Sequence, residues 1–228
     1  MAEEFDVVVA AAGEGSRLGY SQPKAFVPLA GKPLLSYSIS VFEHHPNVGV
    51  IIVVVSEQMM EQADEVLSSL DIQKPVHLVP GGQHRWQSVR NGVEKSLAQW
   101  IMVHDAARPF VTKEVIDGVL AKREAFRCCI TATPVVDTIR RYEDEQCLET
   151  IDRSELLRVG TPQLFNRDSL MGAFRQISTF KSLPTDEAML MEQSGIPVGF
   201  AWGDSLNFKI TTPQDLAVAE ALLATGKK

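Results

Sequence analysis

A glycine-rich segment directly after an apolar run is the clearest chemical signal in this sequence. The run "VVVAAA" (7–12) is followed by "GEGSRLG" (13–19), and Lys24 comes five residues later. Consecutive backbone N–H groups in a tight turn can all point at one anion. The guanidinium of Arg17 offers a fork for phosphate oxygens, and the ammonium of Lys24 adds a mobile point charge. The pattern indicates a phosphate-binding loop; the alternative is a surface turn with two solvated cations.

Two common phosphate-binding motifs do not fit this loop. The dinucleotide fingerprint G-x-G-x-x-G needs its third glycine one position before Gly19. The acidic residue after the second strand, Glu57, comes about forty residues past the loop, where that motif expects about twenty. A P-loop needs Gly-Lys-Ser/Thr, which the segment lacks. The loop therefore predicts phosphate binding outside both standard classes.

Two further strand ends carry polar residues. Gly81-Gly82, followed by Arg85 and Ser88, joins a strand to a helix, and it is either a tight turn or a backbone pocket for a base or ribose. Asp105 ends a hydrophobic strand, where it either caps the next helix or meets Mg²⁺ or a ribose hydroxyl. The side chain of His104 points to the opposite face of that strand, and we interpret it as structural.

The elements that must position these residues alternate along the chain. Apolar runs at 5–12, 48–56, 75–79, 100–107 and 127–135 predict strands, and the stretches between them, 33–44, 57–70, 85–97 and 113–125, predict helices. Continuous apolar strands suit a parallel sheet covered on both faces. We therefore expect a doubly wound three-layer α/β fold, in which ligands lie beyond the carboxyl ends of the strands. All three polar strand ends would then face one edge.

The alternation stops after Pro134. Two short segments, 136–141 and 147–152, flank the polar turn "YEDEQ" and predict a protruding β-hairpin at about 136–153, open to use as a substrate flap or a dimer arm. Further strands are expected at 161–165 and 207–210. Helices are expected at 167–178, 186–195 and 211–224, the last with Thr212 as N-cap and Asp215 completing a capping box.

Composition limits the remaining possibilities. The 228 residues carry a formal net charge of −7, which argues against a nucleic-acid partner bound through a general basic field. The three cysteines have no framework spacing, so we expect reduced thiols and a cytoplasmic location. No apolar stretch is long enough for a membrane span, and the acidic start "MAEEFD" has no signal-peptide pattern. We expect one domain, 1–228, with the hairpin inserted.

Longer stretches resemble a known family. "AAAGEGSRLGYSQPKAFVPLAGKPLL" resembles the signature of nucleotidyltransferases that join a nucleoside triphosphate to a sugar or polyol phosphate. "VHDAARPFV", "PVVDTIRR", "TIDRSELL" and "NFKITTPQDLAVAE" narrow the resemblance to the 2-C-methyl-D-erythritol 4-phosphate cytidylyltransferase family of the non-mevalonate isoprenoid pathway, from about Val7 to Glu220. The resemblance implies a three-layer α/β/α, Rossmann-like nucleotidyltransferase fold, a homodimer with the hairpin as its arm, and Mg²⁺ or another divalent cation. In a plant-type source the location would be the plastid stroma, although no transit peptide is seen.

The resemblance also implies a role for each site residue. Arg17 and Lys24 would stabilise the charge on the α-phosphate of CTP and on the leaving pyrophosphate. The nucleotide would be bound by Ala11, Ala12, Gly13, Gly15, Gly82, Arg85, Ser88, Asp105 and Ala106. The acceptor would be bound by Arg108, Thr161 and Lys209, with Thr138 and Arg153 reaching it from the arm of the partner subunit. Asp105 is also the candidate metal ligand, with Mg²⁺ held mainly by the CTP phosphates.

The implied reaction is in-line attack of the acceptor's phosphate on the α-phosphorus of CTP. A phosphate monoester has its second pKa near ~6, so it needs no general base at neutral pH. Three alternatives stay open: a ribitol 5-phosphate cytidylyltransferase, a nucleotide-sugar enzyme of glycosyltransferase type, and a non-catalytic nucleotide-binding module. The second would usually carry a DxD-like metal motif, whereas Asp105 is followed by two alanines. One local departure from the family pattern is Val159-Gly160, where related sequences carry bulkier or polar residues.

Overall fold

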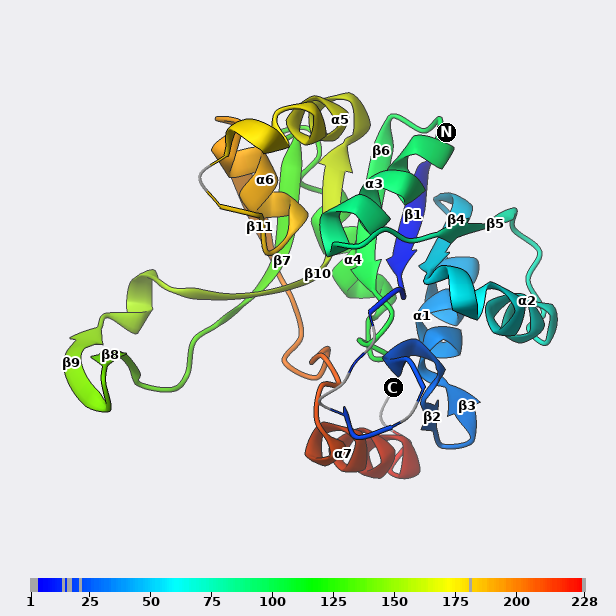
Figure 1. The fold of residues 1–228 in the computed structure, drawn as a ribbon, viewed down its shortest axis with the longest axis horizontal. Coiled ribbons are helices and arrows are strands. Elements are labelled where there is room, and N and C mark those ends of the chain that lie inside the picture. The colour runs from blue at the N-terminus through cyan, green and yellow to red at the C-terminus, as the bar shows by residue number, and fades with distance from the viewer. Residues whose placement is uncertain (1–3, 14, 16–17, 21, 181, 227–228) are drawn as a thin grey trace.

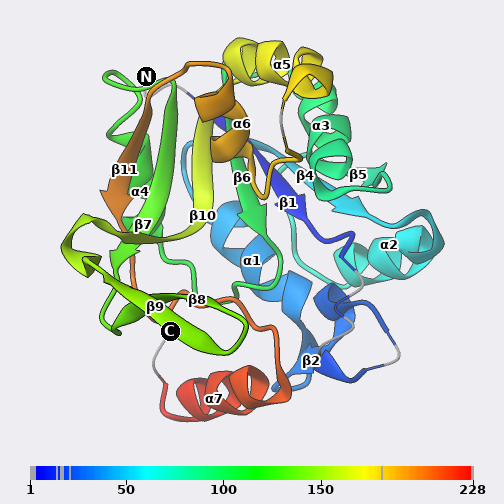
Figure 2. The ribbon, with the colours of Figure 1, turned by 60° about the vertical axis from the view of Figure 1, so that its left-hand side comes forward.

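A computed structural model describes residues 4–13, 15, 18–20, 22–180 and 182–226 of the chain. Its main sheet consists of β1 (Phe5–Ala10), β4 (Val48–Val55), β5 (Val76–Pro80), β6 (Trp100–Asp105), β7 (Cys128–Pro134), β10 (Leu157–Asn166) and β11 (Val198–Trp202). The strand order is β11-β7-β10-β6-β1-β4-β5 (Figures 1 and 2). The paired strands run parallel except β10, which is antiparallel to both β6 and β7. The predicted mostly parallel sheet is confirmed.

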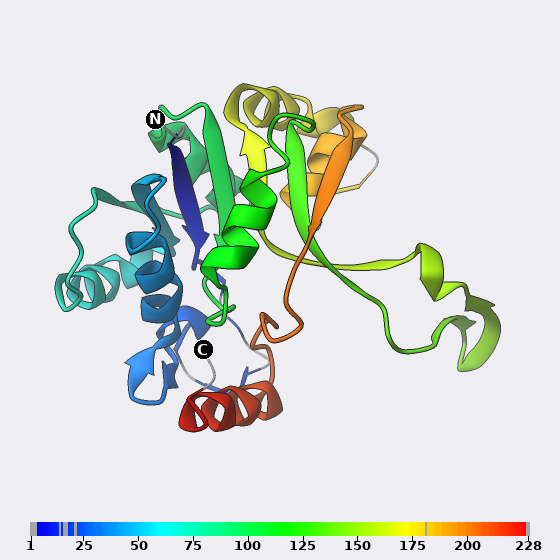
Figure 3. The ribbon, with the colours of Figure 1, turned by 180° about the vertical axis from the view of Figure 1, so that it is seen from behind.

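Helices cover both faces of this sheet. They are α1 (Leu34–Glu43), α2 (Met60–Ser68), α3 (Arg85–Lys95), α4 (Lys113–Leu120), α5 (Arg167–Arg175) and α6 (Glu187–Gln193), while α7 (Pro213–Ala224) lies on neither face. One core cluster joins the sheet to α1, α2 and α4, and a second joins the other face to α3, α5 and α6. Figure 3 shows α1 and α4 in front of the sheet. This is the doubly wound three-layer arrangement expected from the sequence.

Helix α3 packs against the sheet through a glycine. A Cβ atom on Gly92 would lie 2.7 Å from Cγ1 of Val8 in β1 and 2.9 Å from Cγ2 of Val54 in β4. Carbon atoms in contact normally stay about 3.5–4.0 Å apart, so no larger residue fits without moving the helix. Gly92 therefore sets the separation between α3 and the two central strands.

The last helix, α7, packs below the sheet rather than on either face (Figure 1). Leu216 and Ala219 contact a third cluster that includes Leu29 in the small β2–β3 pair, β2 (Pro28–Leu29) and β3 (Lys32–Pro33). The helix begins as predicted: Thr212 accepts a hydrogen bond from the backbone N–H of Asp215, and Asp215 accepts one in return. These two bonds satisfy backbone donors that a helix start leaves open.

The predicted hairpin is present and extends away from the body of the molecule (Figure 1). Its strands are β8 (Ile139–Glu143) and β9 (Gln146–Ile151), longer at the turn than the sequence indicated. Asp144 and Glu145 both have positive φ, 43° and 68°, as a two-residue turn of this type requires. We call residues 136–153 the arm. Every residue of β8, and all of β9 except Ile151, is exposed.

Some predicted elements differ from the structure. Residues 207–210 form no strand, and the backbone N–H of Ile210 instead donates to the carbonyl of Ala107. Strand β11 was not predicted. The helix expected at 113–125 ends at Leu120, and the stretch 57–70 begins with a 3₁₀ turn, Glu57–Met59, before α2. Pro33, expected at the first helical position of 33–44, is the residue before α1. None of the helices in the described part of the chain is long and apolar enough to cross a membrane.

Candidate active site

A cavity of about 680 Å³ lies where the polar strand ends meet. Segments after β1, β5 and β6 all contribute to it, as expected for carboxyl ends of parallel strands. The predicted residues that line it are Ala11, Ala12, Gly13, Gly15, Lys24, Gly82, Arg85, Ser88, Asp105, Ala106 and Lys209. Arg108, Thr138, Arg153 and Thr161 do not line it, and Arg17 lies outside the described residues.

Gly15 of the glycine-rich segment lies very close to Lys24. Gly15 has a φ of +69°, and a Cβ atom there would lie only 2.6 Å from Cβ of Lys24. A residue with a side chain would meet both strain in the backbone and a clash with the lysine. Lys24 itself starts a short 3₁₀ helix, Lys24–Phe26, whose Ala25 and Phe26 are buried. The buried pair fixes the base of the lysine beside the loop.

The second loop is held by the side chain of Ser88. The backbone N–H of Gly82 donates to the Ser88 hydroxyl at 3.0 Å, and Ser88 is 4% exposed. A Cβ atom on Gly81 would lie 2.8 Å from Cβ of Ala12, so the second loop touches the first. Helix α3 then starts with His84 and Gln87 in a capping box. The two glycine-containing loops therefore form one continuous wall.

Asp105 lies at the centre of a cluster of cations. Its carboxylate is 2.9 Å from Nζ of Lys209, 3.2 Å from Nη2 of Arg85 and 3.7 Å from Nε of Arg108. Burial alone would raise the pKa of Asp105, but the three cations outweigh it and hold the pKa well below its usual range. The alternative that Asp105 caps the next helix does not apply, because Thr112 caps α4.

Arg85 connects this cluster to a buried glutamate that sequence reasoning missed. Its Nη1 donates to both carboxylate oxygens of Glu187, at 2.8 Å and 2.6 Å, and Glu187 is 1% exposed. Burial lowers the pKa of Arg85, but the carboxylates of Glu187 and Asp105 outweigh it and the net pKa is raised. Arg85 was predicted to bind the nucleotide, and the structure shows it between two carboxylates. In the sequence, Glu187 lies at the start of a predicted helix, within the stretch "TDEAMLMEQSG" (185–195) that also resembles the family.

Thr161 lies behind Asp105 and is 4% exposed. Its hydroxyl accepts a hydrogen bond from the backbone N–H of Asp105 at 3.0 Å and lies 3.1 Å from Nδ1 of His104. Nε2 of His104 lies 3.1 Å from the carbonyl oxygen of Arg108, which can only accept, so Nε2 carries the proton and Nδ1 accepts from Thr161. Burial lowers the pKa of His104 to about 4. His104 is structural here, and Thr161 fixes the backbone of Asp105.

The described residues do not by themselves form a metal site. No group of three or more His, Cys, Asp or Glu side chains among them is placed to hold a metal ion. Asp105, the predicted metal ligand, already pairs with three cations. A divalent cation takes six or more oxygen ligands, and one carboxylate paired in this way does not supply them. Any cation bound here would need its ligands from a substrate.

The two predicted arm residues do not line this cavity in the same chain. Thr138 and Arg153 are exposed, and a guanidinium nitrogen of Arg153 donates to the carbonyl oxygen of Val136 at the base of the arm. Figures 1 and 3 show the arm reaching outward from the sheet. Within one chain, the arm adds nothing to the cavity wall.

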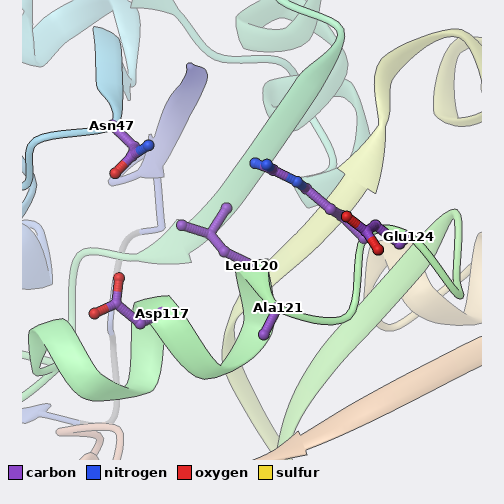
Figure 4. Close-up of a pocket in the computed structure, with 6 residues that line it drawn as sticks. Asn47, Asp117, Leu120, Ala121 and Glu124 are labelled. Carbon is purple, nitrogen blue, oxygen red and sulfur yellow. The ribbon is translucent and has the colours of Figure 1, made fainter. Parts of the chain in front are cut away.

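A smaller hollow of about 260 Å³ lies at the opposite edge of the sheet, near the start of β4 and the end of α4 (Figure 4). Asp117 on its wall already pairs with His45 at 3.0 Å and with Lys113. The hollow contains none of the residues predicted for the site. The chemistry is therefore concentrated at the carboxyl edge.

The sequence matches the family model described as 2-C-methyl-D-erythritol 4-phosphate cytidylyltransferase (IspD) over residues 5–225. The chain belongs to this family. Proteins of the same name from Halalkalibacterium halodurans and Bacillus licheniformis are 40% and 38% identical to it, and the alignments cover 99% and 98% of the chain and 99% and 97% of those proteins.

Solved structures agree with the fold. The crystal structure of 4-diphosphocytidyl-2C-methyl-D-erythritol synthase from Anaerococcus prevotii superimposes with a TM-score of 0.85 at 23% identity, covering 97% of this chain and 96% of the other. The resemblance drawn from the motifs, the three-layer fold and the nucleotidyltransferase class are thereby confirmed.

Proposed function

We propose that this chain transfers the cytidylyl group of CTP to 2-C-methyl-D-erythritol 4-phosphate, giving 4-diphosphocytidyl-2-C-methyl-D-erythritol and pyrophosphate. Family membership across nearly the whole chain supports the substrates. The single observation that carries the chemistry is the cavity in which the glycine loop, Lys24, Asp105 and Lys209 face the same space. Its volume lies within the range of about 300–1,000 Å³ found for small-molecule sites.

In this proposal the nucleotide binds at the part of the cavity that is lined by Gly13 and Gly15 of the glycine loop. Gly13 and Gly15 line the cavity, and in this proposal their backbone N–H groups bind phosphate oxygens, as those of tight turns commonly do. In this proposal the positive charges of Lys24 and Arg17 stabilise the negative charge on the α-phosphate. Arg17 belongs to the glycine loop, and Lys24 follows it in the sequence. Charge stabilisation of this kind is the main task in phosphoryl transfer, because little covalent chemistry is left to the protein.

The acceptor end is the cluster around Asp105. Lys209 and Arg108 both pair with that carboxylate, so an incoming phosphate dianion competes with Asp105 for the two cations. Arg85 stays with Asp105 during this exchange because Glu187 holds it in place. The acceptor's phosphate oxygen then attacks the α-phosphorus, and pyrophosphate leaves toward Lys24. No general base is needed, since the attacking group is already anionic.

A divalent cation has a limited place in this proposal. The described side chains do not form a cation cage, so the oxygen ligands would come chiefly from the triphosphate of CTP. The whole chain acts as one catalytic domain with the arm inserted. The cytoplasm is the proposed location; the free thiols of Cys128, Cys129 and Cys147 suit a reducing compartment.

The arm completes the acceptor site of a second subunit in this proposal. Light scattering is expected to give a dimer. A sharper experiment mixes a Lys24→Ala subunit with an Arg153→Ala subunit. If each site combines the body of one subunit with the arm of the other, mixing restores one intact site per heterodimer and activity recovers. No recovery on mixing would place Arg153 in the site of its own chain or outside the reaction.

Pyrophosphate release tests the reaction directly. CTP with methylerythritol phosphate is expected to release pyrophosphate, and CTP with ribitol 5-phosphate is expected to release little. Faster release with ribitol 5-phosphate would replace the acceptor and keep the reaction class. CTP binding without release on either acceptor would leave a nucleotide-binding module and end the catalytic proposal.

A further inference from the structure

A second cavity, of about 210 Å³, adjoins the nucleotide cavity at Lys209, which lines both. It lies beside the carboxyl end of β7 and the start of β10. The polar residues on its wall include Arg108, Arg158, Lys209, Thr133 and Asp204. Three of these are cations, and the proposed chemistry uses only two of them. Arg158 is the cation without a role.

The guanidinium of Arg158 differs from the other two in its pairing. Arg108 and Lys209 both pair with Asp105. Arg158 is exposed, and its Nε donates to the hydroxyl of Thr133, directly across from it on β7, at 3.2 Å. Within the described part of the chain it takes part in no ion pair. Its remaining N–H groups are therefore available to a ligand in the cavity.

Gly160 keeps the space between Arg158 and Arg108 open. Residues 158 and 160 lie on the same face of a strand because side chains alternate. A Cβ atom on Gly160 would lie 3.5 Å from Nη1 of Arg108, so a longer side chain would occupy the surface against which that guanidinium rests. The absence of a side chain at Gly160 therefore leaves room in this cavity.

We propose that Arg158 binds the hydroxyl groups of the acceptor and sets which polyol phosphate is used. This inference rests on the proposed function. The acceptor's phosphate must approach the α-phosphorus in the nucleotide cavity, so it lies at Lys209, the residue that both cavities share. The polyol chain then enters the smaller cavity. There, Arg158 donates hydrogen bonds to hydroxyl oxygens, and the carboxylate of Asp204 accepts from hydroxyl groups.

The geometry predicts a specific kinetic pattern. A hydrogen bond between a charged group and a ligand contributes enough that its loss weakens binding about 10-fold or more. Arg158→Ala is expected to raise the KM for methylerythritol phosphate by at least that factor, with a smaller effect on kcat and the KM for CTP unchanged. Arg158→Lys keeps the charge but not the fork, so it recovers only part of the loss.

Two further variants separate a binding role from a structural one. Gly160→Gln fills the cavity while keeping the arginine at position 158, and it is expected to raise the same KM and to lower the ratio of methylerythritol phosphate to ribitol 5-phosphate turnover. Arg90→Ala is the matched control, because Arg90 is also exposed and pairs with Glu94 on α3, outside both cavities. It is expected to leave all constants unchanged.

The experiment measures steady-state kinetics with each acceptor varied, and calorimetric binding of methylerythritol phosphate in the presence of a non-hydrolysable CTP analogue. Parallel increases of Kd and acceptor KM in Arg158→Ala support the proposal. An unchanged acceptor KM in a folded Arg158→Ala protein overturns it while the proposed reaction stands. If the unmodified protein neither binds nor turns over methylerythritol phosphate, the proposed function falls, and this inference falls with it.

Discussion

Arg85 and Glu187 form a buried, two-bond ion pair that joins α3 to α6 at the edge of the active-site cavity. The same guanidinium also donates to Asp105 at 3.2 Å. An arginine held on two sides by carboxylates has little freedom to turn toward a ligand. Arg85 therefore fixes the position of Asp105, and its predicted contact with the nucleotide stays a prediction.

Glu187→Gln is expected to destabilise the protein by about 3 kcal/mol, because it leaves the partly buried guanidinium without one of its charge partners. Urea denaturation gives this value. Helix α3 offers a matched control in Glu94→Gln, since the Arg90–Glu94 pair is exposed and such pairs contribute about 0.5 kcal/mol or less. Equal losses in the two variants would contradict the role given to Glu187.

Thr161→Val removes the hydroxyl between Asp105 and His104 while keeping the shape of the side chain. The backbone N–H of Asp105 and Nδ1 of His104 would both lose a buried partner, at a cost of about 1–3 kcal/mol. We expect lower stability and a lower kcat, with Thr161→Ser close to the unmodified protein in both. An acceptor KM that rises in Thr161→Val while stability stays constant would instead support direct contact with the acceptor.

The buried imidazole of His104 predicts a pH dependence of stability. Its pKa is about 4 in the folded protein and ~6.5 in the unfolded chain, so the unfolded state binds more protons as pH falls. Stability is therefore lost as pH falls through 6.5 toward 4. Between pH 7 and pH 5 the loss from this residue is about 2 kcal/mol.

Chemical denaturation at several pH values measures that slope, and His104→Asn is expected to flatten it. His45 has its pKa lowered by burial as well, so a residual slope is expected in the variant. His77, exposed on β5, provides the control substitution His77→Asn. A slope that His104→Asn leaves untouched would mean that His104 is already charged in the folded protein.

Lys24→Ala is expected to lower kcat by about 100-fold or more, the range typical for losing one preorganised charge contact. Turnover in the pyrophosphate assay measures the effect. Lys32→Ala, at an exposed lysine in β3, serves as the control and should retain full activity. Normal turnover in Lys24→Ala would remove this lysine from the mechanism.

The sequence predicts the site residues best where they directly follow parallel strands, because the strand direction alone determines their position. Parallel strands bring the residues after 10, 80 and 105 to one edge, so Gly13, Gly82 and Asp105 could be grouped without coordinates. Glu187 could not be grouped with them, because its partner Arg85 lies 102 residues away and nothing in a short helix marks which face is buried. The resemblance assigns Thr161 to the acceptor, which stays a prediction, but the sequence does not show that its hydroxyl contacts the backbone of Asp105 and the ring of His104.

Local packing explains why strand β11 was not predicted and why residues 207–210 were wrongly predicted as a strand. In β11 the large residues Phe200 and Trp202 point to the exposed side and the small ones inward, which reverses the usual pattern. A Cβ atom on Gly199 would lie 2.4 Å from the ring of Phe126, so packing selects the glycine there. Residues 207–210 have a strand-like composition, but their backbone bonds to the loop at Ala107 instead of a sheet edge.

Gly92 is a buried residue outside the cavity, but its packing controls the position of a residue that lines the cavity. Helix α3 carries Arg85 in its first turn, and Gly92 lies about two turns further along the same helix. A methyl group added at Gly92 would push α3 away from Val8 and Val54. The resulting tilt of the helix would displace the guanidinium of Arg85 at its N-terminal end. Substitutions at Gly92, which does not line the cavity, are thus expected to disturb the catalytic site. Mutational screens restricted to residues that line the cavity would miss such inactivating substitutions.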